Sequence, residues 1–272
     1  MKKILLIIFL LFAVGYSCSA QTKPIDLARK ILTESTDNSE FYAEDFETKF
    51  DFKELRTLYN LTFKSTPIKD NVEVVSVTAK GKENNDLNFY LYFHRYESRW
   101  KLFDWQHYEG STEKHYLKML NNLDKKQIDS IIKSNDDRKI FTSKEQFNYM
   151  KSVYDLALNS DEQIVNYLRQ NKKDFEKLKK QFDNFVTNNP EYNNSEKNTF
   201  FSENYYSGLS ISNITEHFQG LDNCLTFIIS ENGYEAVGYF YTSDKIKIPI
   251  INPKKIFFIQ EIEEGWYMFR ST

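Results

Sequence analysis

The stretch EEGWYMFRST, residues 263–272, follows a charged turn with a run of large apolar side chains. The last residues of a domain fray unless they pair in a sheet or dock on a core. Trp266 and Met268 alternate with Tyr267 and Phe269, so a strand formed here has two apolar faces. Such a strand is typical of a central or covered position. The sequence therefore predicts that this strand is tied into a sheet and that Trp266 covers one end of a core.

A related string, ESRWKLFDWQ at residues 97–106, predicts the same arrangement earlier in the chain. It follows two runs rich in β-branched and aromatic residues, VEVVSVTAK at 72–80 and NFYLYFHRY at 88–96. The strings GKENND and ES separate these runs and are typical of turns. Residues 72–108 are therefore predicted to form a three-stranded antiparallel meander.

Helical spacing precedes this meander. Pro24 suits the first position of a helix, and Ile25, Ala28, Ile31 and Leu32 follow on one face. From Glu40 to Phe63, apolar residues recur mostly every three to five positions, which predicts one broken helix or two short ones; these residues are Phe46, Phe50, Leu55, Leu58 and Leu61.

The middle third of the chain carries three helix-start signals. Asp124 with Gln127, Ser143 with Gln146 and Ser160 with Gln163 have the spacing of a capping residue and its partner in the first turn. Two apolar stripes follow, one from Phe147 to Ala157 and a longer one from Ile164 to Phe185. They predict an antiparallel helical hairpin joined near Asn159. Asn171 falls where the second stripe needs a core residue, and packing within the chain is favoured over a dimeric coiled coil.

Strands return after a polar string, NNPEYNNSEKN at 188–198, which predicts a linker with few contacts between the modules on either side. Asn232 and Gly233 join two apolar runs and suit the positive φ angles of a type I′ hairpin turn. A second hairpin turns at Glu263–Gly265. The predicted fold class is α+β, with N-terminal helices and an antiparallel meander, a central helical hairpin and a C-terminal antiparallel β module. The boundaries are a signal peptide at 1–20, an α+β module at 21–110, a helical region at 111–189, a linker at 190–198 and a β-rich module at 199–272.

The N-terminus has the pattern of a secretory signal peptide. Lys2 and Lys3 precede eleven apolar residues, too few to span a bilayer as a helix, and the string CSAQ follows. Cleavage before Gln21 predicts a periplasmic or secreted protein with no transmembrane segment in the mature chain. The alternative is a lipoprotein anchored through a lipidated Cys18.

Composition and charge narrow the class of partner. Glycine and proline total 13 of 272 residues and aromatic residues reach 16%, which indicates a packed globular protein. Loss of Lys2 and Lys3 with the signal leaves 34 basic and 39 acidic residues, a net charge of −5. This balance argues against nucleic acid and against general attraction to anionic lipid. The expected partner is an unknown protein or small molecule.

Motifs that carry chemistry are missing from the sequence. It contains no phosphate-binding glycine loop, nucleophile elbow, zinc-protease helix or calcium loop. His107, Glu109, Glu113 and His115 lie close together, but their spacing matches no common metal site. Cys224 precedes an apolar run and is expected to be a buried small hydrophobe. We therefore expect no metal, no cofactor and no catalytic residue.

One strand suggests a binding surface. Leu87, Phe89, Leu91 and Phe93 share one face and are expected in the core. The opposite face carries aromatic rings with polar tips and is the candidate ligand-binding surface, formed by Tyr90, Tyr92, His94 and Tyr96. The alternative is that another element covers this face and leaves the hydroxyl groups at its rim.

Residues 24–108 resemble the nuclear-transport-factor-2-like or cystatin-like α+β domains of exported bacterial proteins. The resemblance rests on helices leading into a meander and on the strand Arg99–Gln106, with its tryptophan, lysine and apolar residues. Such folds have four or more strands, whereas only three are predicted here. The resemblance implies no catalytic residue, because the acid and histidine dyads of the enzymatic members have no counterpart.

These observations favour an exported, non-catalytic binding or interaction protein. One alternative is a periplasmic inhibitor or immunity-type protein, which would also be acidic and without catalytic motifs. The other is an enzyme or small-molecule carrier whose pocket lies on the face of Tyr90, Tyr92 and His94.

Overall fold

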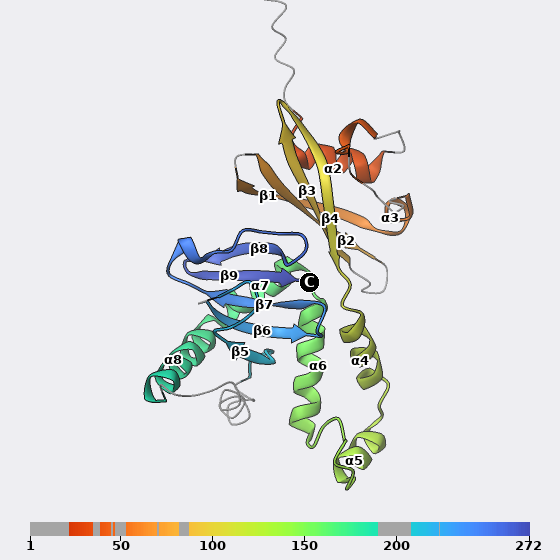
Figure 1. The fold of residues 1–272 in the computed structure, drawn as a ribbon. Coiled ribbons are helices and arrows are strands. Elements are labelled where there is room, and N and C mark those ends of the chain that lie inside the picture. The colour runs from red at the N-terminus through yellow and green to blue at the C-terminus, as the bar shows by residue number, and fades with distance from the viewer. Residues whose placement is uncertain are drawn as a thin grey trace, which may run out of the picture.

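The computed structural model describes residues 22–34, 39–44, 46, 53–69, 71–81, 87–189, 208–222 and 224–272 (Figure 1). The predicted signal peptide, Cys18, Phe50 and the predicted linker at 190–198 lie outside these residues. Among the helices that are described, none combines the length and the apolar character needed to cross a membrane.

The chain has the predicted α+β architecture, with two antiparallel sheets and helices before and between them. The α-helices are α2 Pro24–Thr33, α3 Lys53–Leu58, α4 Ser111–Asn121, α5 Lys125–Lys133, α6 Lys144–Leu158, α7 Asp161–Gln170 and α8 Lys172–Asn188. The strands are β1 Asn60–Lys69, β2 Val72–Lys80, β3 Leu87–Tyr96, β4 Arg99–Tyr108, β5 Asn213–Thr215, β6 Leu225–Glu231, β7 Ala236–Tyr241, β8 Ile256–Glu263 and β9 Trp266–Ser271. Short 3₁₀ turns occupy Ser39–Phe41 and Lys245–Lys247.

The N-terminal sheet has four strands in the order β1-β2-β3-β4, one more than the sequence analysis predicts. Leu61 and Phe63, expected in a helix, lie in β1 and pair with Ala79 and Val77 of β2. They alternate with Thr62 and with Lys64, a period of two that the helical interpretation overlooks. The resemblance to nuclear-transport-factor-2-like or cystatin-like domains stays a prediction.

The two faces of β3 separate as predicted. Phe89, Leu91 and Phe93 are buried against helix α2, in a core that includes Leu27 and Ile31. Tyr90 and Tyr92 point to the other side, into the core shared with the C-terminal sheet. The middle of the sheet, at β3, is therefore covered on both faces.

The central helices begin at the predicted caps. The Asp124 and Ser160 side chains accept hydrogen bonds from the backbone of the third residue of α5 and α7. In both helices that residue is a glutamine, whose side chain accepts a hydrogen bond from the backbone of the capping residue. Ser143 caps α6 in the same way, although Gln146 turns to Thr142 instead. The prediction of one continuous helix from Ile164 to Phe185 is wrong, because the helix is interrupted at Asn171 and forms α7 and α8. The Asn171 amide donates to the Tyr167 carbonyl at 2.8 Å and so ends α7.

The C-terminal sheet has the order β5-β6-β7-β9-β8, so the strand quoted at the outset lies between two others, as predicted. The type I′ turn is wrong in detail. Gly233 has a φ of 85°, but Asn232 is not in the left-handed region. Its side chain accepts hydrogen bonds from the backbone of Tyr234 and Glu235 at 3.1 and 2.8 Å, which closes the loop without a second positive φ.

The two modules share one hydrophobic core, contrary to the expectation of few contacts. The Tyr90 ring lies 4.6 Å from that of Phe258 and 5.2 Å from that of Phe257, centroid to centroid. Helix α7 packs into the same core through Ile164 and Leu168. Figure 1 shows the C-terminal sheet lying beside the N-terminal one, with α7 behind it.

Trp266→Ala tests the role of the final strand. Trp266 is fully buried, packs on Phe227 and Phe175, and donates its indole proton to Glu176 at 2.8 Å. We expect the free energy of unfolding to fall by about 3–5 kcal/mol, in a single transition because the core is shared. Urea denaturation followed by circular dichroism measures the change. Tyr234→Ala, at a side chain 85% exposed, is the control and should change it by less than about 0.5 kcal/mol. An equally small loss for Trp266→Ala would contradict this role.

Candidate functional site at the junction of the modules

The four predicted ligand-binding residues occupy different environments. Tyr90 and Tyr92 are buried, His94 is half-buried and Tyr96 is exposed. The Tyr92 hydroxyl donates to the carbonyl of Phe257, and the His94 ring bonds to the Asn71 amide at 3.0 Å. The C-terminal sheet thus covers the part of the face that carries Tyr90 and Tyr92. Ligand binding by these four residues stays a prediction.

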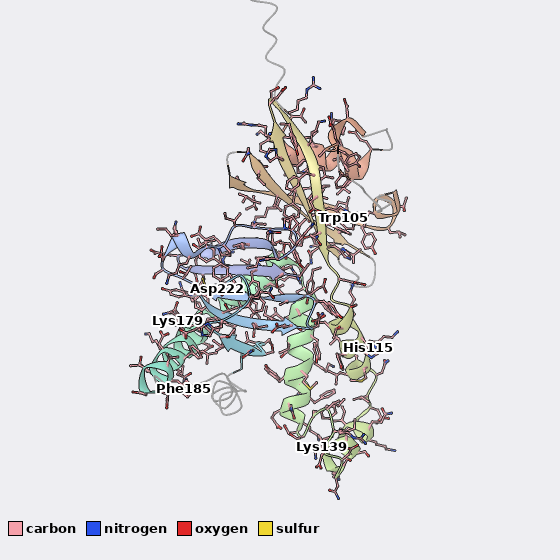
Figure 2. The ribbon with its side chains drawn as sticks, in the orientation of Figure 1. Trp105, His115, Lys139, Lys179, Phe185 and Asp222 are labelled. Atoms are coloured by element: carbon pink, nitrogen blue, oxygen red, sulfur yellow. The ribbon has the colours of Figure 1, made fainter. Side chains whose placement is uncertain are left out.

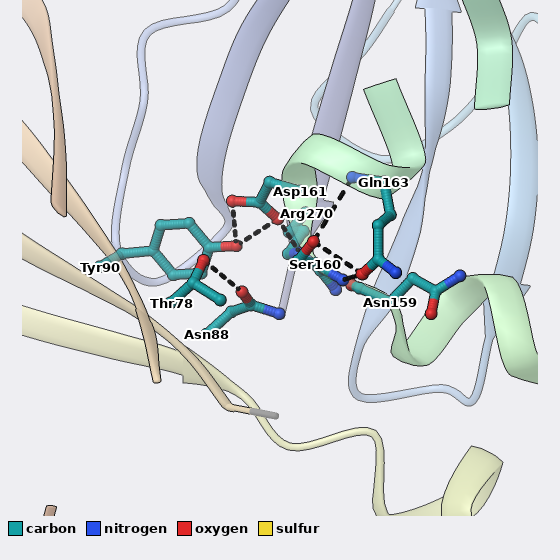
Figure 3. A network of polar contacts seen from close by, with 8 residues as sticks. All are labelled: Thr78, Asn88, Tyr90, Asn159, Ser160, Asp161, Gln163 and Arg270. Carbon is teal, nitrogen blue, oxygen red and sulfur yellow. Dashed lines mark hydrogen bonds and ion pairs between the residues drawn. The ribbon is translucent and has the colours of Figure 1, made fainter. Parts of the chain in front are cut away.

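A buried ion pair lies where β3, α7 and β9 meet (Figure 3). The Arg270 Nε donates to Asp161 Oδ1 at 2.9 Å, and the Tyr90 hydroxyl lies 2.9 Å from both carboxylate oxygens. Arg270 also donates through Nη2 to the Asn159 carbonyl at 3.0 Å. The capping box at Ser160 begins α7 and places Asp161 in its first turn. One carboxylate therefore joins both sheets and the helix between them.

Charge and burial reinforce this arrangement. Arg270 is fully buried, and its guanidinium carbon lies 4.3 Å from the centroid of the Tyr108 ring. Burial lowers the pKa of Arg270, but its neighbours, among them the carboxylate and hydrogen bond of Asp161, together raise it above its ordinary value, so the side chain stays charged. Burial is also the largest cause of the raised pKa of Tyr90, which remains a neutral donor to Asp161. Removing one partner alone would leave the other as an unpaired buried charge, so we expect such a change to destabilise the fold.

A second set of contacts ties the end of β4 to the β6–β7 hairpin. The Glu235 carboxylate accepts from the backbone of Glu109 and Gly110 at 2.9 and 3.0 Å. Glu113, fully buried in α4, accepts from the Ser230 hydroxyl at 2.6 Å. Together with the ion pair, these bonds fix the relative position of the two sheets at two places.

A groove of about 380 Å³ opens beside the ion pair. Its walls come from strands β1 and β2 on one side and from helix α7 on the other, with one residue of β8. Most of the lining side chains are polar or charged, and the lining residues are Thr62, Phe63, Lys64, Ser76, Thr78, Asp161, Glu162, Val165, Arg169 and Gln260. Asp161 lines the groove and also forms the ion pair, so the buried network holds one wall residue of the groove in place.

Sequence reasoning misses this site for identifiable reasons. Thr62 lies in the stretch predicted to be helical, which ends at Phe63, and the capping signal at Ser160 and Gln163 gives no functional role to Asp161. Arg270 carried a signal, because it is a charged residue in a strand that is otherwise apolar on both faces. A charge at such a position is buried only when it is paired.

The cluster of histidine and acidic residues at 107–115 does not come together. His107 stacks on Trp105, with ring centroids 5.5 Å apart, whereas Glu113 faces Ser230. Figure 2 shows His115 on α4, away from Trp105 on β4. Within the described part of the chain, no group of three histidine, cysteine or acidic residues is arranged to hold a metal ion.

Comparison of the chain with protein-family models, with curated proteins and with solved structures finds no match.

Arg270→Met tests the buried pair. Removing the guanidinium leaves the buried Asp161 carboxylate without its cation, and we expect the free energy of unfolding to fall by about 3–5 kcal/mol. Adding Asp161→Asn neutralises the stranded charge and should recover part of the loss. The control is Lys172→Met, at a pair 3.0 Å from Glu263 with side chains 46% and 29% exposed, which should cost at most about 1 kcal/mol. Equal losses for the two single variants in chemical denaturation would contradict a special role for the buried pair.

Alkaline pH should unfold the protein cooperatively. Burial is the main cause of the raised pKa of Tyr90, Tyr92, Tyr108 and Tyr239. An unfolded tyrosine ionises near pH 10, so above about pH 10 the unfolded state loses protons that the folded state keeps, and stability falls as pH rises. Phenolate absorbance of these residues should therefore appear together with the loss of circular dichroism. Full ionisation of these residues before any unfolding would rule out this protection.

Proposed function

We propose that this protein is an exported, non-catalytic binding protein that holds a small polar molecule in the groove at the junction of its modules. The observation that carries the proposal is the groove itself, whose volume of about 380 Å³ falls within the range of small-molecule sites. Export is proposed from the basic, apolar and small residues at 1–20. Cleavage before Gln21 gives the soluble form, and lipidation of Cys18 the anchored alternative.

The position of the groove supports a binding role. The face of Tyr90 and Tyr92, where a pocket was expected, is occupied by Phe257 and Phe258 of β8. Beside this closed region, Thr62, Ser76 and Thr78 still face an open space. A ligand in that space would contact both modules, and it would do so next to the tyrosines rather than on them.

Rigid walls also support a binding role. The Asp161 side chain that lines the groove is held by Arg270 and Tyr90, and Arg169 is held by the Ile262 carbonyl at 3.2 Å. Groups already fixed in place lose little conformational entropy when a ligand binds, so more of the interaction energy appears as affinity.

A bulky side chain in the groove tests this proposal. Gln260→Trp should fill the space, whereas Glu261→Trp places the same ring on the neighbouring, exposed residue of β8 and is the matched control. The measurement is a thermal-shift screen of polar metabolites, because a ligand that binds only the native state raises the melting temperature. Compounds that stabilise the natural protein and Glu261→Trp should not stabilise Gln260→Trp.

Two outcomes would refute the groove as the binding site. In the first, compounds stabilise Gln260→Trp as well as the natural protein, which places their site elsewhere. In the second, no compound stabilises the natural protein at millimolar concentration, which refutes the proposal that the groove binds a small molecule.

A further inference from the structure

The hydroxyl groups along the sheet side of the groove are acceptors. Thr62 donates to the Thr78 carbonyl at 3.3 Å, Ser76 donates to the Lys64 carbonyl at 3.3 Å, and Thr78 donates to the Asn88 amide oxygen at 3.1 Å. A hydroxyl has one proton to donate and two lone pairs to accept with. Because these protons are already used, the hydroxyls offer only lone pairs, and a ligand must bring donors to them.

Two carboxylates add to this acceptor character. Asp161 Oδ2 accepts only from Tyr90 among the hydrogen bonds of the described residues, and so keeps a free lone pair. Glu162 is exposed on the next residue of α7 and lines the same space. The charge of Asp161 is balanced by Arg270, whereas Glu162 has no ion pair within the described ranges. A ligand ammonium group would find both lone pairs and an unbalanced negative charge here.

Cationic donors lie on both walls of the same groove. Lys64 on β1 is exposed, and its ammonium group has no hydrogen bond or ion pair to another described residue. Arg169 on α7 is held by its bonds to Asn166 and Ile262, at 3.4 and 3.2 Å. Two cations on facing walls are a fitting environment for a carboxylate.

We propose that the groove recognises a zwitterion, a short peptide with free ends. Its ammonium end would contact Glu162 and the acceptors along the sheet, and its carboxylate end would contact Lys64 and Arg169. This inference rests on the proposed function and adds the chemical class of the ligand. A neutral polar molecule would leave these charges without partners, and a simple anion would face the carboxylates as well as the cations.

Three probes that differ only at their ends test this assignment by isothermal titration calorimetry. They are trialanine, N-acetyl-trialanine, which lacks the ammonium, and trialaninamide, which lacks the carboxylate. A hydrogen-bonded charge that is lost costs enough to weaken binding about ten- to a hundredfold, and we expect this for each blocked peptide. Equal affinities for the three peptides would overturn the proposal.

Variants of the natural protein assign each end to its wall. Lys64→Met should weaken binding of trialanine and leave that of trialaninamide unchanged, since the amide has no carboxylate to lose. Glu162→Gln should weaken binding of trialanine and leave that of N-acetyl-trialanine unchanged. Lys80→Met, at an exposed lysine of β2 outside the groove lining, is the control and should change nothing. Loss of trialanine affinity in Lys80→Met to the same degree as in Lys64→Met would contradict the assignment.

Failure here is distinguishable from failure of the proposed function. If Gln260→Trp abolishes binding of an uncharged compound and trialanine does not bind the natural protein at millimolar concentration, the groove is a binding site for another class and the zwitterion is wrong. If trialanine binds Gln260→Trp as tightly as the natural protein, both the site and its ligand class are wrong.

Discussion

The structure depends on a buried charge pair formed by residues that lie far apart in the chain. Arg270 comes from β9, Asp161 from the start of α7, and Tyr90 from β3. The described residues form no disulfide, so noncovalent contacts hold one sheet against the other, and this pair is the buried charged contact among them. Its stabilising effect is conditional, because desolvation of two charges is compensated only when both partners and their hydrogen bonds are present. That condition favours one arrangement of the modules over all others.

The groove follows from this arrangement. The C-terminal sheet places Phe257 and Phe258 over the middle of the N-terminal sheet and leaves the β1 side uncovered. The polar residues at that side would be ordinary surface groups on an isolated sheet. Opposite α7 they become one wall of a space with charged groups on the other, so the site is a product of the contact between modules.

Much of the fold can be predicted from local pattern. The alternation of β3, the capping boxes of α5 and α7, and the apolar faces of β9 each reflect a period or a cap that a few residues determine. The errors have physical causes. Leu61 and Phe63 suit a helix and a strand equally, and pairing with β2 decides between them. The break at Asn171 interrupts a stripe that still reads as continuous, because α7 and α8 bury neighbouring parts of it.

The site cannot be predicted from the sequence for a different reason. No local pattern indicates that Asp161 meets Arg270, since 109 residues separate them and only the packed structure brings them together. Likewise, no local pattern indicates that Lys64 and Arg169 line the same groove. Residue types indicate that a buried charge needs a partner, but they do not identify the partner.

The central position of β9 has a consequence for how the molecule forms. This strand is the last of the described strands to be synthesised, yet β7 and β8 both pair with it. Until it emerges, β8 has no neighbour in the sheet and Asp161 has no cation. Helices and the N-terminal meander can begin to fold as the chain grows, since their contacts are local. The contact between the two sheets through Arg270 and Asp161 therefore forms only after β9 has been synthesised, although most of the other strands and helices precede it in the chain.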